Sequence, residues 1–192
     1  METNTDIKNK LTHIEIDHIL SALVPYKSDE RAGVIKLVTK YENKYRDYLK
    51  ELERIERLKR YEHKYDQYLY ICGIDEVGRG PLCGPVVAGA VILPKDTTIL
   101  YIDDSKKLSE QKRELLYDEI MEQAIAVGVG YGSVDLIEEV NILNATKIAM
   151  VEAIKALGIV PDMILVDAVT IPNIRITQES IIQGDTKSIS IA

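Results

Sequence analysis

Hydrophobic positions change their spacing near residue 68, and this change divides the chain into two regions. Between residues 34 and 67, apolar residues recur at alternating steps of four and three, and no Gly or Pro interrupts them. That spacing gives a helix one apolar stripe, made of Tyr41, Tyr45, Tyr48, Leu52 and Ile55. Past residue 68, short apolar runs alternate with helical stretches, as in α/β domains. We predict a helical N-terminal extension over residues 1–67 and an α/β domain over 68–192.

The second region has the pattern of a mixed sheet flanked by helices. Its first two strands, near 68–76 and 85–93, are joined by a turn too short for a helical crossover, so they should pair antiparallel. Ser109 is suited to cap a helix that runs to about Ala124. The other predicted elements are strands at 126–133, 162–167 and 180–182 and helices at 135–139 and 144–157.

The first region allows two interpretations of its tyrosines. The sequence of residues 1–33 predicts weakly ordered helix and turn, with a break near Pro25. The stripe that follows is continued by Tyr61, Tyr65 and Tyr68. Tyrosines among Lys and Arg can act as stacking platforms for nucleic-acid bases. The same stripe can instead pack the helix against its neighbour, with the charges as a solvated face, and we favour this interpretation.

Composition favours a cytoplasmic globular protein. The chain has 192 residues, 46% of them hydrophobic, with no Phe or Trp, so Ile, Leu, Val and Tyr must form the core. No apolar run approaches the roughly 20 residues that span a bilayer, and the first ten residues are polar. Cys72 and Cys83 match neither a metal-binding spacing nor a disulfide framework, so we expect buried thiols in a reducing compartment.

Charge is distributed unevenly between the two regions. Residues 1–70 carry 14 Lys and Arg against 13 Asp and Glu, whereas residues 71–192 carry 10 against 18, a formal charge of −8. A domain this acidic is unsuited to polyanions by bulk electrostatics. Three explanations remain open: it does not bind nucleic acid, divalent metal offsets its acids, or basic sequence lies outside this chain.

Acidic residues at strand ends are the candidate chemistry. Asp75 and Glu76 end the first strand of the domain, Gly78-Arg79-Gly80 follows at once, and Asp167 ends a later apolar run. Neighbouring side chains on a strand point to opposite faces, so the backbone must turn if both acids serve one site. Glycine permits such a turn. Solvated loops also contain Asp-Glu pairs, but acids at the ends of buried strands are costly unless paired or metal-bound.

Four motifs in a fixed order resemble bacterial ribonuclease HII, the type-2 ribonuclease H. They are Asp75-Glu76-Val77-Gly78-Arg79-Gly80-Pro81-Leu82, Asp104-Ser105-Lys106-Lys107-Leu108, Leu165-Val166-Asp167-Ala168 and Gly184-Asp185-Thr186-Lys187-Ser188. The resemblance runs from about residue 69 to Ala192, and residues 1–66 lie outside it. It implies a ribonuclease H-like mixed five-stranded sheet flanked by helices, in agreement with the strand pattern.

The resemblance also implies an activity and its site. Members of the family are endonucleases that cut the RNA strand of RNA–DNA hybrids and incise duplex DNA at single ribonucleotides during ribonucleotide excision and DNA replication. They leave a 5′-phosphate and a 3′-hydroxyl and use two Mg²⁺ or Mn²⁺ ions, which favour carboxylate oxygens. The match makes Asp75, Glu76 and Asp167 the catalytic metal ligands of a monomer.

Substrate-binding residues follow from the same match. Gly78, Arg79 and Gly80 correspond to the loop that inspects the ribose 2′-hydroxyl, the group that separates RNA from DNA. Lys106 and Lys187 correspond to phosphate contacts, although each is also explained as a surface lysine. Two further acids of the motifs, Asp104 and Asp185, are expected to stabilise turns, with Asp185 the nearer to the metal ligands.

One departure from the family concerns its fourth metal-binding acid. The resemblance implies that this acid lies about ten to fifteen residues beyond the segment Lys187–Ala192. We therefore expect a chain ending at Ala192 to be a C-terminally shortened form that binds metal weakly and cuts RNA–DNA hybrids slowly or not at all, and one extended past Ala192 to be active. The alternative is a catalytically impaired hybrid-binding form. A metal- or phosphate-binding domain with a partner-binding Tyr-rich arm is disfavoured by the ordered motifs.

Overall fold

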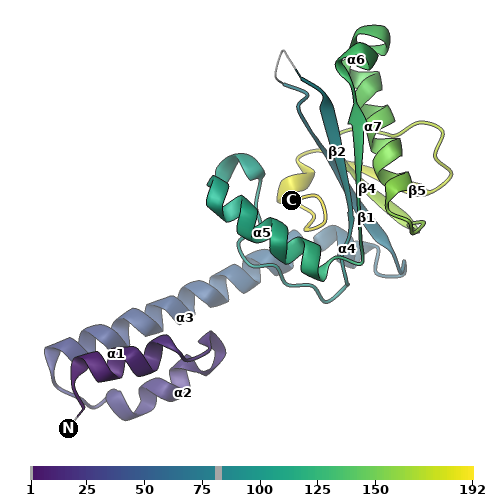
Figure 1. The fold of residues 1–192 in the computed structure, drawn as a ribbon. Helices are drawn as coiled ribbons and strands as arrows, with labels where there is room; N and C mark the ends of the chain where they lie inside the picture. The colour runs from purple at the N-terminus through teal and green to yellow at the C-terminus, as the bar shows by residue number, and fades with distance from the viewer. Residues whose placement is uncertain (1, 81–83) are drawn as a thin grey trace. The chain divides into compact units, whose positions relative to one another are not determined.

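The computed structural model describes residues 2–80 and 84–192, which form two compact units, Met1–Arg54 and Ile55–Ala192 (Figure 1). The first unit contains α1 (Asn4–Thr12), α2 (Ile19–Leu23) and most of α3 (Ala32–Leu58). The second contains α4 (Arg60–Lys64), β1 (Ile71–Val77), β2 (Val86–Ile92), α5 (Glu110–Gln123), β3 (Ala126–Gly132), α6 (Val134–Val140), α7 (Ile142–Ala156), β4 (Met163–Asp167) and β5 (Thr177–Ile181).

The N-terminal unit is built on the predicted tyrosine stripe. A capping box between Thr3 and Asp6 begins α1, and the core that α1 and α2 form with α3 is Ile7, Leu11, Ile19, Leu23, Val34 and Tyr41. Tyr41 is buried and Tyr45 packs partly against the same core. Neither residue is an open stacking platform, so the packing interpretation of the stripe is confirmed here.

The sheet of the second unit has the strand order β3-β2-β1-β4-β5. The β1–β2 and β2–β3 pairs are antiparallel, as predicted for the hairpin, whereas β1–β4 and β4–β5 are parallel. This confirms the mixed five-stranded sheet flanked by helices. The topology places β1, which carries Asp75 and Glu76, at the centre of the sheet.

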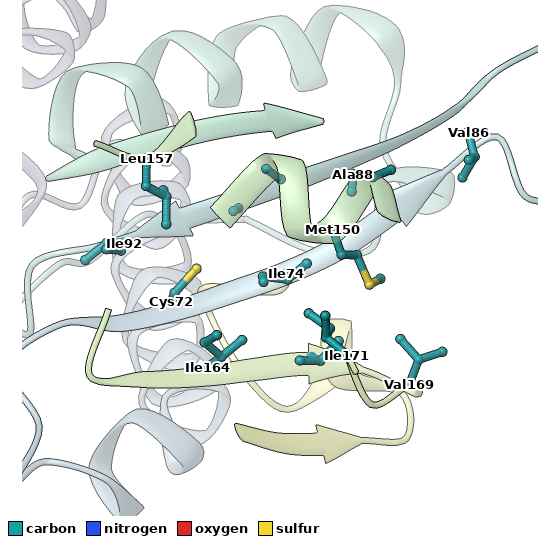
Figure 2. Packing of buried hydrophobic residues seen from close by; sticks show 14 of the residues in the cluster. Cys72, Ile74, Val86, Ala88, Ile92, Met150, Leu157, Ile164, Val169 and Ile171 are labelled. Carbon is teal, nitrogen blue, oxygen red and sulfur yellow. The ribbon is translucent and has the colours of Figure 1, made fainter. Parts of the chain in front are cut away.

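One face of the sheet is covered by α7. Side chains on alternate positions of β1 point to it, and Figure 2 shows Cys72 and Ile74 of β1 gathered with Ile164 of β4, Met150 of α7 and Leu157, which caps the C-terminal end of α7. All but Leu157 are fully buried. The buried free thiol of Cys72 fits the sequence expectation, and Cys83 lies outside the described residues.

The opposite face of the sheet is covered by α4 and the C-terminal segment. Its core cluster contains Ile71 of β1, Met163 and Leu165 of β4, Ile181 of β5 and Ile191 near the C-terminus. Three residues around α4 pack partly against this cluster, namely Tyr61, Tyr65 and Tyr68. The second half of the tyrosine stripe is therefore also a packing surface.

The predicted bounds of the last strand, 180–182, are wrong, because β5 covers Thr177–Ile181. Its sequence is polar and only Ile181 is buried, so hydrophobic pattern could not locate its start. The strand is recruited by parallel pairing to β4. Among the residues described, no helix is both long and apolar enough to cross a membrane.

We predict that Gly130→Ala destabilises the protein by roughly 2 kcal/mol, the size of an overpacked core. A Cβ atom at Gly130 would lie 2.0 Å from the carbonyl oxygen of Ala149, so α7 could no longer approach β3. Urea unfolding measures the change. The control is Gly89→Ala on β2, where a Cβ atom meets no described atom within 4 Å; equal losses in both variants would contradict the packing argument.

Candidate active site

The acids at the ends of β1 and β4 are brought together by parallel pairing. Ile74 of β1 is in register with Val166 of β4, so Asp75 and Asp167 occupy the next position on each strand. Neighbouring positions of paired strands share one face of the sheet. Both carboxylates therefore lie on the face covered by the C-terminal segment, and residues far apart in sequence meet at one edge.

Asp167 is held in place by the backbone. Its Oδ1 accepts a hydrogen bond of 2.7 Å from the amide of Gly184. The residues beside this contact have left-handed backbone, with φ of 51° at Ala168 and 58° at Gln183. Such conformations cost non-glycine residues of order 1 kcal/mol and persist where the surroundings impose them. The chain bends sharply on both sides of the contact that fixes the carboxylate.

Asp75 lies in a position that disfavours its charge. The pKa of Asp75 is raised to about 7, mainly by burial and in smaller part by the nearby carboxylates of Glu76, Asp167 and Asp185. A hydrogen bond of 2.7 Å from the Glu76 amide to Oδ1 works in the opposite direction. Three other acids thus act electrostatically on the carboxyl group of Asp75, which is typical of a site that binds a cation.

Glu76 has one paired and one unpaired oxygen. Its Oε1 lies 3.4 Å from Nη1 of Arg79, while its Oε2 is buried and has no hydrogen-bond partner among the described residues. Burial raises the pKa of Glu76, and Arg79 opposes that shift. A buried carboxylate oxygen without a partner is costly, so this atom is suited to a ligand that supplies positive charge.

A groove of about 650 Å³ connects these residues. It is lined by Asp75, Glu76, Asp167 and Asp185, by the loop Gly78–Gly80, and by Asp104, Ser105 and Lys106. Asp185 also lines the groove, whereas the sequence favoured a turn role for it and placed it nearer to the metal ligands than Asp104. Asp104 does have the predicted role, because its Oδ1 accepts the amide of Lys106 and begins a short 3₁₀ helix, Ser105–Lys107.

The donor set fits a hard divalent cation, although the described residues do not form a complete metal site. Within residues 2–80 and 84–192, no group of three or more His, Cys, Asp or Glu side chains is close enough to hold one metal ion. Four carboxylates around one groove, with an unpaired buried oxygen on Glu76, are nevertheless the ligands that Mg²⁺ and Mn²⁺ prefer. The role of Asp75, Glu76 and Asp167 as metal ligands stays a prediction.

The loop after β1 forms one side of the groove. Gly78 has a φ of 92°, and a Cβ atom there would lie 2.4 Å from the carbonyl oxygen of Pro85, so this position requires glycine. At Gly80 a Cβ atom would meet no described atom within 4 Å. Gly80 is therefore open to a ligand, whereas Gly78 serves the turn.

The two predicted lysines differ in their surroundings. Lys106 is exposed and lines the groove. The ammonium group of Lys187 donates a hydrogen bond of 2.6 Å to the carbonyl oxygen of Ile182, so in this conformation it stabilises its own turn. A phosphate contact by either lysine stays a prediction. Sequence reasoning also missed Gly184, which binds Asp167 through its amide; the glycine of the Gly184–Ser188 motif was the available signal.

Comparison with known proteins identifies the family. The family model described as Ribonuclease HII matches residues 72–192. The chain belongs to the ribonuclease HII family. A second family model, the Ribonuclease HII N-terminal domain, matches residues 4–66, so the likeness to ribonuclease HII extends beyond the motifs into the N-terminal helices.

Individual ribonuclease HII proteins agree with this assignment. The chain is 63% identical over 167 residues to ribonuclease HII of Lachnoclostridium phytofermentans, covering 87% of this chain and 66% of that relative. It is 48% identical over 189 residues to ribonuclease HII of Clostridioides difficile, covering 97% and 74%. The chain thus spans about two-thirds to three-quarters of the length of these relatives.

A solved structure supports the fold. The crystal structure of ribonuclease H2 from Pyrococcus horikoshii has a TM-score of 0.53 and 26% sequence identity to this chain. The match covers 64% of this chain and 66% of that one. The strand order found here and this likeness together establish a ribonuclease H-like fold for the second unit.

We predict that Asp75 makes a contribution to the stability of the metal-free protein that is lost as pH rises from about 4 to about 7. The pKa of Asp75 is higher in the folded state than its usual value of 3.8, so the folded state binds this proton more tightly than the unfolded state. Asp75→Asn should weaken this decline and make the protein more stable than wild type at pH 8. Thermal unfolding with a chelator, from pH 4 to 8, measures the difference.

The control for this series is Glu152→Gln, an exposed acid of α7. It should follow the wild-type pH dependence, because its charge lies outside the groove. A wild-type slope unchanged in Asp75→Asn would show that Asp75 is already ionised at low pH in the folded protein.

Proposed function

We propose that this chain is an endonuclease that hydrolyses the RNA strand of RNA–DNA hybrids and incises duplex DNA at single ribonucleotides, leaving a 5′-phosphate and a 3′-hydroxyl. The observation that carries the proposal is the groove in which Asp75, Glu76, Asp167 and Asp185 gather beside the Gly78–Gly80 loop. Membership of the ribonuclease HII family supports the reaction class. We further propose that it acts as a monomer in the cytoplasm.

Asp75, Glu76 and Asp167 are the residues that would hold Mg²⁺ or Mn²⁺, and Asp185 is placed to assist them. In phosphodiester hydrolysis, two bound divalent ions neutralise charge on the scissile phosphate and activate water. The chain contributes oxygen ligands of controlled orientation. Gly184 fixes the carboxylate of Asp167, and the Glu76 amide fixes that of Asp75.

Binding of a polyanion to an acidic domain requires local compensation. The groove collects several of the acids that make residues 71–192 net negative, so cations bound there would offset the repulsion where the phosphate must lie. This supports the second of the three explanations for the charge distribution. Arg79 and Lys106, both exposed at the groove, are placed to contact phosphate.

Selection of a ribonucleotide is assigned to the loop Gly78–Gly80. Backbone amides and carbonyls of a glycine-rich loop can approach a 2′-hydroxyl closely, and this hydroxyl distinguishes RNA from DNA. The open position at Gly80 leaves room for such an approach. The alternative function, hybrid binding without cleavage, is not favoured, because the acid-lined groove of a nuclease family is present.

We predict that the chain cuts a DNA duplex containing one ribonucleotide in Mg²⁺ or Mn²⁺, and that Asp75→Asn slows cleavage at least about 100-fold. A loss of this size is typical when a group that stabilises transition-state charge is removed. Single-turnover cleavage of a fluorescent duplex measures the rate, with Glu152→Gln as the charge-matched control. Duplex binding without cutting by the wild type would support the alternative function, and unchanged cleavage by Asp75→Asn would contradict the site.

We predict that Gly80→Ala lowers cleavage at a single ribonucleotide while leaving the melting temperature unchanged. The added methyl group meets no described atom of the protein but occupies the space through which the loop would approach a 2′-hydroxyl. Arg79→Ala should act in the same direction. Parallel cleavage and thermal-unfolding measurements check this, and equal losses of stability and activity would mark the loop as structural.

A further inference from the structure

The short helix α4 carries a carboxylate that binds the C-terminal segment. We propose that Glu62 is a positioning residue for the active site: it fixes residues Ser188–Ala192 and, through them, the carboxylate of Asp167. The inference rests on the proposed function, because it assigns a further residue to the same site. Glu62 itself does not line the groove among its described residues.

Glu62 binds the segment through one oxygen. Its Oε1 accepts hydrogen bonds from the Ser188 hydroxyl at 2.5 Å, the Ser190 amide at 3.1 Å and the Ser190 hydroxyl at 2.7 Å. Both serines are buried, at 0% and 8% exposed. Three hydrogen bonds from two residues converge on this one oxygen, so the contact determines where the segment lies.

The segment held by Glu62 packs directly on β1. A Cβ atom at Gly73 would lie 2.1 Å from the Ser190 carbonyl oxygen and 2.2 Å from its carbon, so backbone touches backbone at this point. Gly73 lies two positions before Asp75 on the same face of the strand. The Ser190 backbone therefore covers β1 immediately beside the acid edge.

The same segment contacts the turn that binds Asp167. A Cβ atom at Gly184 would lie 2.8 Å from Cδ1 of Ile191 and 3.1 Å from Oδ1 of Asp167, so Gly184 is enclosed between them. Its amide donates the hydrogen bond of 2.7 Å to Asp167. A continuous series of contacts thus runs from Glu62 through Ser190 and Ile191 to Gly184 and Asp167.

Stability alone is a poor explanation for Glu62. Its Oε2 is buried without a partner among the residues described, as is Oγ1 of Thr97, and both residues line a pocket of about 30 Å³. Burying a carboxylate with one oxygen unsatisfied costs free energy that an apolar side chain would avoid. Retaining a carboxylate there is explained if its three directed hydrogen bonds specify the position of the segment.

The same helix offers a matched control. Lys64 donates to both carboxylate oxygens of Glu179 on β5 at 2.9 Å, and so attaches α4 to the sheet edge through a separate ion pair. Lys64→Ala loosens the helix, whereas Glu62→Ala also releases the C-terminal segment. Glu62→Gln keeps an acceptor at Oε1 and places an amide where Oε2 has room near Thr97, so it should retain most of the contact.

The test measures the Gly184 amide and metal affinity in the same variants. Hydrogen exchange of the Gly184 amide, followed by NMR, reports the Asp167 contact without any metal. Mn²⁺ titration calorimetry reports the site. We expect Glu62→Ala to accelerate Gly184 exchange and weaken Mn²⁺ binding about 10-fold, the lower end for groups that orient metal ligands. Glu62→Gln and Lys64→Ala should stay close to wild type in both measurements.

The double variant Ser188→Ala/Ser190→Ala supplies the same test if Glu62→Ala does not fold, since it removes only two hydroxyl donors. It should shift both measurements in the direction expected for Glu62→Ala. The inference is overturned if Glu62→Ala and the double variant change Gly184 exchange and Mn²⁺ affinity no more than Lys64→Ala does. The proposed function would then remain intact. A wild type without Asp75-dependent Mn²⁺ binding would overturn the proposed function, and the role of Glu62 in it.

Discussion

Parallel pairing of β1 with β4 is the constraint on which the rest of the domain depends. It places Asp75 and Asp167 at adjacent strand ends, and no local structure could bring these residues together. A parallel pair needs a long connection, which here contains β2, β3 and three helices. Of those elements, β2 and β3 extend the sheet on one side of β1 and α7 covers one of its faces, so the acids are supported by a rigid centre rather than by loops.

Placing several carboxylates in one groove costs free energy. Burial and mutual repulsion oppose the ionised form of Asp75, and Glu76 has an oxygen with no partner among the residues described. The fold offsets part of this cost with directed donors from the backbone, such as the Gly184 amide, and with the Arg79 guanidinium. Repulsion among the carboxylates remains, and a bound cation would relieve it. Cation binding would therefore stabilise the folded state.

Much of the fold and the candidate site could be predicted from sequence, and the failures have physical reasons. Periodicity located the tyrosine stripe and all strands except β5, whose polar Gln178 and Glu179 lack a hydrophobic signal. Ordered motifs pointed to Asp75, Glu76 and Asp167, which line one groove, and their role as metal ligands stays a prediction. The role of Glu62 could not be predicted, because its partners lie more than 120 residues away and any surface helix can carry a glutamate. Left-handed backbone at Ala168 is likewise imposed by tertiary contacts.

Chemical reaction of the Cys72 thiol can report when β1 opens. Its thiol is fully buried beneath α7, and burial raises its pKa to about 12, so the reactive thiolate is suppressed by both access and ionisation. Alkylating reagents and oxidants can reach this sulfur only when the centre of the sheet opens. Cys72 precedes Asp75 on β1. The rate at which its thiol is labelled would therefore measure how often this strand opens.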